Sequence, residues 1–370
     1  MLFIALLLLA PIVTFAYQSS YGTKRNLLVL AAPSIWDTNY QNHFYDIIQF
    51  QLDFAKMIQG RDDVIILADR HTMPFLDGRA HRIRGKLSSD SLLQANIYDI
   101  HLRQFAPFGL KHMIKFDYRP FDMDKLAARQ IDESMKRFLT SNKLTVDRNE
   151  TELVLGGSDI IDNGFDKAIV DERVLLDNKD RLPDWAVMIK LLNEFHKVAM
   201  APMPNKTTTG HQMRLDDLVS FVDREILLMA DVSKNYTAEM HRVLYKKFRN
   251  DVSVIEIPMR QAMHADAPPK GICGLYTALL ATDRFIYAPV FGNDPSNWEM
   301  GHSSMTDRKM IQLIQVNTHK VVVPVNMPRV ICEMGASLKT LAWQVKGKMA
   351  EKLRQVAKWQ GRRRYFRYLA

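Results

Sequence analysis

The sequence predicts an α/β fold, and three observations support this prediction. Short apolar segments with the length of buried strands alternate with segments whose apolar residues recur at helical spacing. Hydrophobic residues make up 47% of the 370 residues, which is enough to bury a large core. No Gly/Ser-rich or Pro-rich linker divides the chain, so the sequence does not require two domains.

The first half of the chain supplies the clearest elements. Residues 26–32 (NLLVLAA) predict a buried strand that ends before Pro33, and residues 64–68 (VIILA) predict the next strand. Between them, apolar residues recur on one helical face up to Gly60, which ends the helix: Phe44, Ile47, Ile48, Leu52, Ala55 and Ile58. The same spacing from Ala128 to Leu139 predicts a second helix, and residues 184–198 predict a long third one.

The second half continues the alternation without a visible internal repeat. Strands are predicted at residues 226–230, 252–257, 275–280, 285–290 and 320–325. Helices are predicted at residues 237–248 and 304–314. Strands that alternate with helices in this way are typical of α/β proteins.

The N-terminus carries a short apolar segment that predicts secretion. Residues 2–16 (LFIALLLLAPIVTFA) are too short to span a bilayer comfortably, and Ala16 is the small residue that a signal peptidase requires. We therefore expect a signal peptide over residues 1–16. The alternative is an uncleaved N-terminal anchor, because no Lys or Arg precedes the apolar run.

Two further features concern the same compartment. Three N-x-T sequons predict N-glycosylation, at Asn149, Asn205 and Asn235. The two cysteines, Cys273 and Cys332, are too few for a disulfide scaffold. They could form one bond in an oxidising lumen or remain two buried thiols, and the sequence does not choose between these states.

The charge of the chain is concentrated at its C-terminus. The net charge is +9, and residues 346–370 carry nine basic residues against Glu351 alone. A basic tail of this kind suits contact with a polyanion or an anionic surface, although a solvated terminal helix has the same composition. We expect no sequence-specific nucleic-acid recognition, no cofactor and no metal site, because the histidines lack metal-ligand spacing.

Five segments, in order along most of the chain, carry a resemblance to a known family. They are residues 98–107 (YDIHLRQFAP), 116–120 (FDYRP), 155–163 (LGGSDIIDN), 215–223 (LDDLVSFVD) and 334–345 (MGASLKTLAWQV), with a weaker sixth at 289–293 (PVFGN). Together they resemble the Porphyromonas-type peptidylarginine deiminase and agmatine deiminase family. The resemblance implies a pentein fold, a five-bladed α/β propeller around a central acidic channel.

The resemblance also implies a chemistry, the hydrolysis of a guanidinium group to a ureido group and ammonia. Paired carboxylates hold the planar cation. A cysteine thiolate attacks the central carbon, and a histidine protonates the leaving ammonia and then activates water.

Most positions that match the family's reactive residues have changed. The family's W-x-R-D corresponds to His101, Leu102, Arg103 and Gln104, so Arg103 remains and the carboxylate becomes an amide. The acid before the Gly-Gly-Asn of the family becomes Leu155, and the Asn becomes Ser158. At the remaining matched positions, Arg214 replaces a histidine and Asp216 is the family's aspartate. Ala278 replaces an asparagine, Lys339 replaces a second histidine, and Thr340 replaces the nucleophilic cysteine.

We therefore expect a secreted pentein-fold protein that lacks catalysis and has a binding or structural role, with an unidentified small molecule or protein as its partner. We also expect its cleft, if open, to prefer an anion or a neutral ligand. The competing hypothesis is an active C–N hydrolase with a rearranged site that uses Asp216, His211 and either Cys332 or Cys273. A hydrolase built on Thr340 and Lys339 is disfavoured, because adjacent residues on a strand point to opposite faces.

Overall fold

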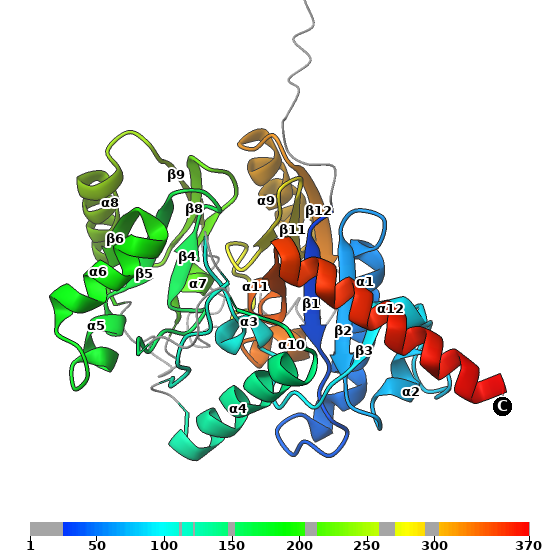
Figure 1. The fold of residues 1–370 in the computed structure, drawn as a ribbon. Coiled ribbons are helices and arrows are strands. Elements are labelled where there is room, and N and C mark those ends of the chain that lie inside the picture. The colour runs from blue at the N-terminus through cyan, green and yellow to red at the C-terminus, as the bar shows by residue number, and fades with distance from the viewer. Residues whose placement is uncertain are drawn as a thin grey trace, which may run out of the picture.

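The buried apolar segments form four small sheets in the computed structural model of this protein (Figure 1). The structure describes residues 25–110, 113–120, 123–146, 152–203, 213–258, 271–292 and 303–369. The predicted signal peptide and three singled-out residues lie outside these ranges: Asn149, Asn205 and His211. Within the described residues the fold is mixed α/β, as the alternating pattern predicts.

The first sheet joins the two ends of the described chain. Its order is β13-β1-β2-β3, from strands Trp343–Val345, Leu27–Ala31, Asp63–Ala68 and Leu92–Gln94. β13 lies antiparallel to β1, whereas β1, β2 and β3 are parallel. Helix α1 (Phe44–Ile58) makes the crossover between β1 and β2, and its buried face matches the predicted apolar face. The short helix α2 (Met73–Leu76) follows β2.

Three more sheets repeat one arrangement, in which an antiparallel pair is followed by a helix and a parallel third strand. The first is β4 (Ile160–Asp162), β5 (Lys167–Asp171) and β6 (Lys197–Ala201), with helices α5 (Arg173–Asn178) and α6 (Asp184–Phe195). The second is β7 (Val219–Phe221), β8 (Ile226–Asp231) and β9 (Ser253–Pro258), with α8 (Lys234–Phe248). The third is β10 (Leu280–Ala281), β11 (Phe285–Val290) and β12 (Val321–Asn326), with α9 (Ser304–Val316).

The segment between the first and second sheets has a reduced form of the same arrangement. Phe108 and Ile114 form an antiparallel bridge, and Asp117 forms a parallel bridge with Val154. Helix α4 (Lys125–Ser141) lies between the two partners of the parallel bridge, as a crossover helix does in the full sheets. This segment is therefore comparable in connectivity to the three-stranded units.

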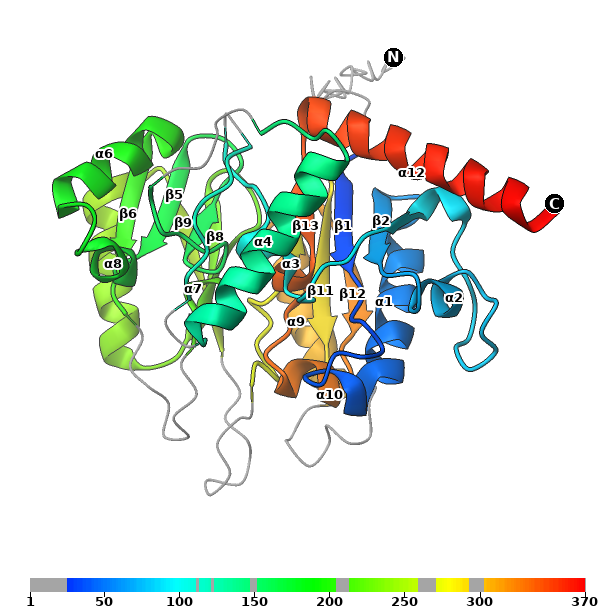
Figure 2. The ribbon, with the colours of Figure 1, turned by 60° about the horizontal axis from the view of Figure 1, so that its bottom comes forward.

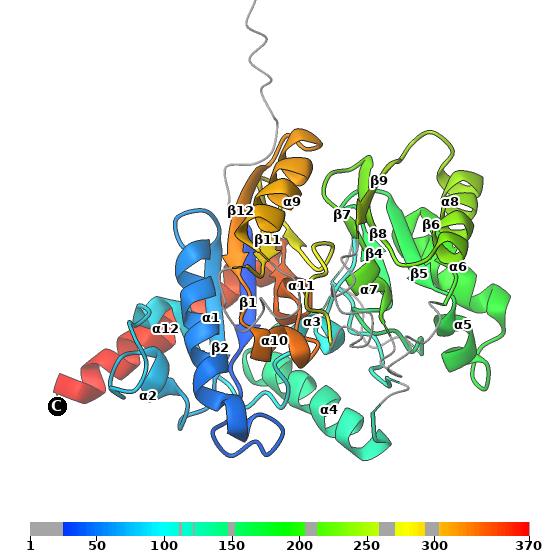
Figure 3. The same ribbon diagram turned by 180° about the vertical axis from the view of Figure 1, so that it is seen from behind.

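Short helices occupy the middle of the molecule. Figures 1 and 3 show α3 (Leu102–Phe105), α7 (Leu215–Leu218) and α11 (Leu338–Leu341) between the sheets of β4–β9 and those of β1–β3 and β10–β13. Helix α10 (Arg329–Glu333) precedes α11. All three central helices follow loops, and two of them, α3 and α11, pack against each other.

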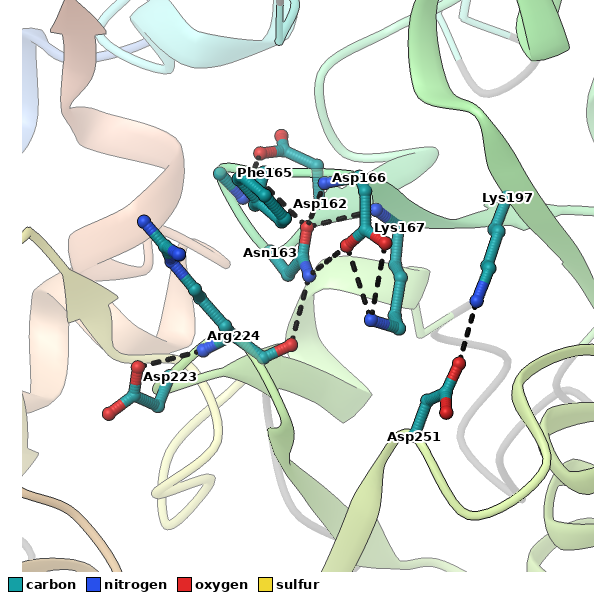
Figure 4. A network of polar contacts seen from close by, with 10 residues as sticks. Asp162, Asn163, Phe165, Asp166, Lys167, Lys197, Asp223, Arg224 and Asp251 are labelled. Atoms are coloured by element: carbon teal, nitrogen blue, oxygen red, sulfur yellow. Dashed lines mark hydrogen bonds and ion pairs between the residues drawn. The ribbon is translucent and has the colours of Figure 1, made fainter.

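One asparagine joins two neighbouring sheets (Figure 4). The Asn163 side-chain oxygen accepts hydrogen bonds from the backbone N–H groups of Phe165, Asp166 and Lys167, which closes the turn between β4 and β5. Its amide donates to the backbone oxygen of Arg224, in the turn between β7 and β8, over 2.9 Å. The Arg224 guanidinium lies 4.3 Å from the Phe165 ring centroid. These contacts fix the two hairpins relative to each other.

The basic C-terminal segment forms one helix, α12 (Gly347–Leu369), which crosses the first sheet (Figure 2). Its own residues Leu353 and Ala357 are fully buried against the sheet. Arg354 donates to Asp63 over 2.8 Å, and Arg364 donates to the backbone oxygen of Leu92 over 2.7 Å. The basic tail is thus anchored to the sheet along one face.

Two predicted elements differ from the structure. The helix predicted at residues 184–198 ends at Phe195, because His196 adopts a positive φ of 34° and the chain enters β6. The strand predicted at residues 275–280 is wrong except at Leu280. Residues 275–279 are buried but lie in turns, since apolar side chains can be buried without an extended backbone.

Candidate functional site

The three central helices bring together most of the residues that the sequence singles out. His101 precedes α3, which contains Arg103 and Gln104. Arg214 precedes α7. The Gly156–Gly157 loop connects the first two helices, because the Gly157 N–H donates to the Gln104 backbone oxygen over 3.0 Å.

The same loop reaches α7 through Ser158. The Asp216 N–H donates to the Ser158 backbone oxygen over 3.2 Å, so Asp216 lies on the helix next to the loop. Lys339 and Thr340 lie on α11, which packs against α3. Segments that are far apart in the sequence therefore meet here as the resemblance implies.

Arg103 holds the glycine loop in place. Its Nε donates to the Gly157 backbone oxygen over 3.1 Å, and its Nη2 donates to the Ile160 backbone oxygen over 2.9 Å. A Cβ atom on Gly157 would lie 2.1 Å from the Arg103 backbone oxygen, so this position requires glycine because of close approach. Arg103 therefore positions the backbone of the glycine loop.

Two positions that hold carboxylates in the family resemblance are uncharged and buried. The Gln104 side-chain oxygen accepts a hydrogen bond from the Tyr118 hydroxyl over 2.8 Å. Leu155 belongs to the apolar core with Ile114 and Phe116. Neither side chain can neutralise a cationic ligand.

His101 forms an ion pair outside the glycine loop. Its Nδ1 lies 2.9 Å from the Asp99 carboxylate, which also accepts a hydrogen bond from the Tyr40 hydroxyl over 3.2 Å. Burial of Asp99 opposes its ionisation, but the charge and hydrogen bonds of His101 hold the pKa of that carboxyl below its usual range. His101 thus fixes the start of α3.

Asp216, which the family resemblance matches to an aspartate, is 0% exposed. Neither carboxylate oxygen has a hydrogen-bond partner among the described residues. Burial and the neighbouring Asp217 raise the pKa of Asp216 to about 7, while the charges of Lys339 and Arg103 act in the opposite direction. A buried carboxylate without hydrogen bonds depends on nearby cations for its charge compensation.

Lys339 supplies the cation of this cluster, and its side chain is 5% exposed. Its Nζ donates to the backbone oxygens of Asp216 and Val219 over 2.9 Å each, and to the Ser220 hydroxyl. Burial lowers the pKa of Lys339 to about 7, and Asp216 opposes that shift. An ammonium has three donors, and all three are used here.

Thr340 caps a helix. Its hydroxyl accepts from the Ser337 N–H over 2.9 Å and donates to the Ser337 backbone oxygen over 3.1 Å, while the Ser337 hydroxyl accepts from the Thr340 N–H over 3.0 Å. This pair is a capping box at the start of α11. The expectation that Lys339 and Thr340 lie on a strand was wrong, because this box starts a helical turn. The Lys339 and Thr340 side chains nevertheless point to different partners, Lys339 to α7 and β7 and Thr340 to Ser337.

The space beside Arg214 is very small. A cavity of about 10 Å³ is lined by Arg214, Ser158, Asp159 and Tyr118, among other residues. A volume of this size holds about one water molecule. Ala278, which matches the family's asparagine, is buried and offers no polar side chain. The buried cluster thus consists of three cations, Arg103, Arg214 and Lys339, and three acids, Asp159, Asp216 and Asp217.

The two cysteines form a disulfide, Cys273–Cys332, with a Cα–Cα distance of 4.8 Å. Sequence reasoning left this pairing open, and the structure resolves it. A bonded cysteine has no thiolate, so neither residue can act as a nucleophile in this state.

Sequence reasoning missed four residues that support the cluster. Ser337 caps α11, Ser220 and Asp217 lie beside Lys339, and Tyr118 binds Gln104. All four lie inside the segments that carry the family resemblance. The S-x-x-T spacing of Ser337 and Thr340 resembles a capping box and was a usable signal; the contacts of the other three depend on tertiary packing.

A pH-dependent stability is expected from Asp159. Burial and Asp171 raise the pKa of this carboxyl to about 7, despite Arg214. Its unfolded-state pKa is about 3.9, so protonation stabilises the fold fully below pH 4, and that stabilisation is lost as pH rises through 7. Asp159→Asn should remove this loss. Urea unfolding should therefore show that the free energy of unfolding of the variant, relative to that of the wild type, is higher at pH 7.5 than at pH 4.5. An equal difference at both pH values would contradict a raised pKa for Asp159.

Three features outside the buried cluster concern glycosylation, metal binding and membrane spanning. Asn235, one of the three sequon asparagines, is exposed on the first turn of α8. No group of His, Cys, Asp and Glu side chains suitable for a metal ion is found within the described ranges. Over the same part of the chain, none of the helices has the length and apolarity needed to cross a bilayer.

Comparison with known proteins supports one family. The family described as Porphyromonas-type peptidyl-arginine deiminase matches residues 22–345. The fold is similar to that of C. jejuni agmatine deiminase, with a TM-score of 0.66 and 16% identity over 88% of this chain and 94% of the other. No curated protein sequence matches the chain.

Two further solved structures show the same likeness. Agmatine deiminase of Enterococcus faecalis has a TM-score of 0.62 at 13% identity, over 87% of this chain and 93% of that one. A putative arginine deiminase from Porphyromonas gingivalis has a TM-score of 0.63 at 14% identity, over 87% and 96% of the two chains. At such low identity these likenesses establish the fold alone.

Proposed function

This chain belongs to the Porphyromonas-type peptidyl-arginine deiminase family, and from that premise we propose that it is a member without deiminase activity, whose site holds its own lysine cation. Its role in this proposal is binding or structural. The observation that carries the proposal is the buried Lys339 side chain, whose Nζ donates three hydrogen bonds to α7 and β7 beside the one acid that the family resemblance retains, Asp216.

A guanidinium substrate places two requirements on a binding site. A planar cation needs carboxylates in reach and space to enter. Here Gln104 and Leu155 replace carboxylates, and the charge that compensates Asp216 comes from Lys339, Arg103 and Arg214. The space beside Arg214 is about one water molecule in size. An external cation would have to displace charges that the chain already provides.

The site also offers no activated nucleophile among the described residues. Thr340 stands where the family resemblance places a cysteine, and its hydroxyl is held by the Ser337 backbone. An aliphatic hydroxyl needs an adjacent base for nucleophilic attack. Lys339 donates all three of its hydrogen bonds to other groups, and Arg214 cannot act as a base.

We further propose that the sheets form a five-bladed propeller. The three repeated units, the four-stranded sheet and the reduced segment 108–154 together supply five comparable units. The fold likeness to C. jejuni agmatine deiminase supports this count. A crystal structure with five units arranged around one axis is the expected result.

A direct assay tests the loss of activity. Incubation with agmatine, free arginine and an arginine peptide should give no ureido product, and calorimetric titration should give no binding tighter than about 1 mM. Tight binding of any of these cations would contradict the proposed self-occupied site.

The competing hydrolase, which uses Asp216, His211 and a cysteine, makes a different prediction. Cys332→Ala and Cys273→Ala break the same disulfide but leave different thiols. Ureido formation that is lost in one of these variants and kept in the other would identify a cysteine nucleophile and overturn the proposal. His211 lies outside the described residues.

We also propose that the protein is secreted and glycosylated. The disulfide is typical of oxidising compartments, and the exposed Asn235 is accessible to a glycan. Expression in a secreting eukaryotic cell should place the protein in the medium. Removal of N-glycans should shift its mobility, and Asn235→Gln should reduce that shift; a chain retained in cells without a glycan would contradict this proposal.

A further inference from the structure

The outward face of α12 carries a row of exposed cations. One face of this helix packs on the first sheet through Leu353 and Ala357, which leaves the opposite face in solvent. The exposed basic side chains on the helix are Lys348, Lys352, Lys358, Arg362 and Arg363. None of them forms an ion pair with a described residue, so their charges are uncompensated.

Helical geometry places these cations in one strip. At 100° per residue, Lys348, Lys352 and Arg363 fall within about 60° of one another, and Lys358 and Arg362 flank them on one side. The strip from Lys348 to Arg363 is about 22 Å long at 1.5 Å per residue. Glu351 is the only acid in the whole helix.

The strip continues into a groove at the N-terminal end of α12. The groove lies between this helix and the segment that follows α4, and its volume is about 360 Å³. Lys143 lines one wall, and Lys348 and Lys352 line the other. Its lining also includes Thr145, Gln355 and the one acid of the helix, Glu351, so that three cations face a single carboxylate there. A linear polyanion can enter such a groove, whereas the flat surface of a membrane cannot.

Trp359 adds an aromatic ring to the same face. It is 56% exposed, and the Arg363 guanidinium lies 4.5 Å from its ring centroid. Trp36 and Trp185 are more exposed than Trp359, so what distinguishes Trp359 is its place on the basic face of α12 beside Arg363. Its flat face offers an apolar contact to a sugar ring, with Arg363 next to it for an acidic substituent.

We infer that the outward face of α12 and the groove beside Lys143 bind a linear sulfated polysaccharide. Sulfate groups are permanently charged, and arginine pairs with such oxyanions through two parallel hydrogen bonds. The row of cations along a straight helix fits a linear chain, and the groove favours that chain over a membrane plane. The choice over a nucleic acid rests on the proposed secretion, which the disulfide supports.

Heparin affinity measured on the intact, disulfide-bonded protein tests this inference. Arg362→Gln together with Arg363→Gln should weaken binding of a heparin octasaccharide about tenfold or more, since each surface cation contributes roughly 1 kcal/mol to such contacts. The matched control is Arg308→Gln with Lys309→Gln, two exposed cations on α9. The control should bind like the wild type, and binding should weaken steeply as salt rises.

A second variant separates this assignment from general basicity. Trp359→Ala should weaken octasaccharide binding severalfold while leaving the salt dependence unchanged, because it removes contact area and no charge. Equal losses in the α12 and α9 variants would overturn the inference. Binding to phosphatidylserine vesicles or a DNA duplex as tight as to the octasaccharide would also overturn it, by assigning the surface to another class of partner. The result does not depend on whether the buried cluster is catalytic.

Discussion

Replacing Lys339 with methionine should lower the free energy of unfolding by about 3–5 kcal/mol, the typical cost of removing one partner from a buried charge pair. The substitution removes the donor that binds the backbone oxygens of Asp216 and Val219 and the Ser220 hydroxyl. It also leaves the Asp216 carboxylate with less positive charge nearby, and that carboxylate has no hydrogen-bond partner among the described residues. Guanidinium unfolding followed by circular dichroism measures the loss.

A double-mutant cycle shows whether Asp216 is the source of the effect. Asp216→Asn in the Lys339→Met background should recover part of the loss, because an amide does not need a compensating cation. Lys309→Met on the exposed face of α9 is the matched control and should change stability by less than about 0.5 kcal/mol. Additive losses in the double variant would show that the two side chains are not coupled.

Removal of the Cys273–Cys332 disulfide is the second large effect expected. The bond joins residues separated by 59 positions. In the chain-entropy description a loop of that length corresponds to about 4 kcal/mol, and removal of native disulfides typically costs 2–5 kcal/mol. The Cys273→Ser/Cys332→Ser variant should therefore unfold at a clearly lower denaturant concentration than the oxidised wild type.

The reduced wild type provides the control for this variant. Unfolding in the presence of a strong reductant should shift the wild type to the stability of the double-serine variant and leave the variant itself unchanged. A loss below about 1 kcal/mol in both cases would mean that packing around Cys332, rather than the covalent bond, holds this region together.

Among the described residues, six of the eight longer strands were predictable from the sequence to within about one residue. β5 and β6, with five residues each, were missed, and the first two residues of β6 were predicted as helix. β1, β2, β8, β9, β11 and β12 each have five or six residues, and the predicted segments at 26–32, 64–68, 226–230, 252–257, 285–290 and 320–325 overlap them. β3, β4, β7, β10 and β13 have two or three residues, which is too short for a periodic pattern to be read. Four of these five form the antiparallel pairs, so the repeated arrangement of the sheets could not be seen in the sequence.

The candidate site was predictable in its residues and much less in their roles. The resemblance placed Arg103, Asp216 and Lys339 in one region, and the structure brings their helices together. It did not indicate that Arg103 binds the glycine loop or that Lys339 donates into α7 and β7. These roles depend on where a long side chain points, which is decided by the helix that carries it and by the acceptors around it.

The sequence by itself indicated the family and the α/β class, because residue identity and order are enough for these conclusions. The family resemblance also predicts that cysteine, carboxylate and histidine side chains are lost from the matched positions. Only the tertiary structure decided that the two cysteines are bonded, that Thr340 belongs to a capping box with Ser337, and that Lys339 lies beside Asp216. The first and the last of these depend on a distance between segments far apart in the chain. The physical reason is that a buried charge is stable only with partners in contact, and contact is a property of the fold.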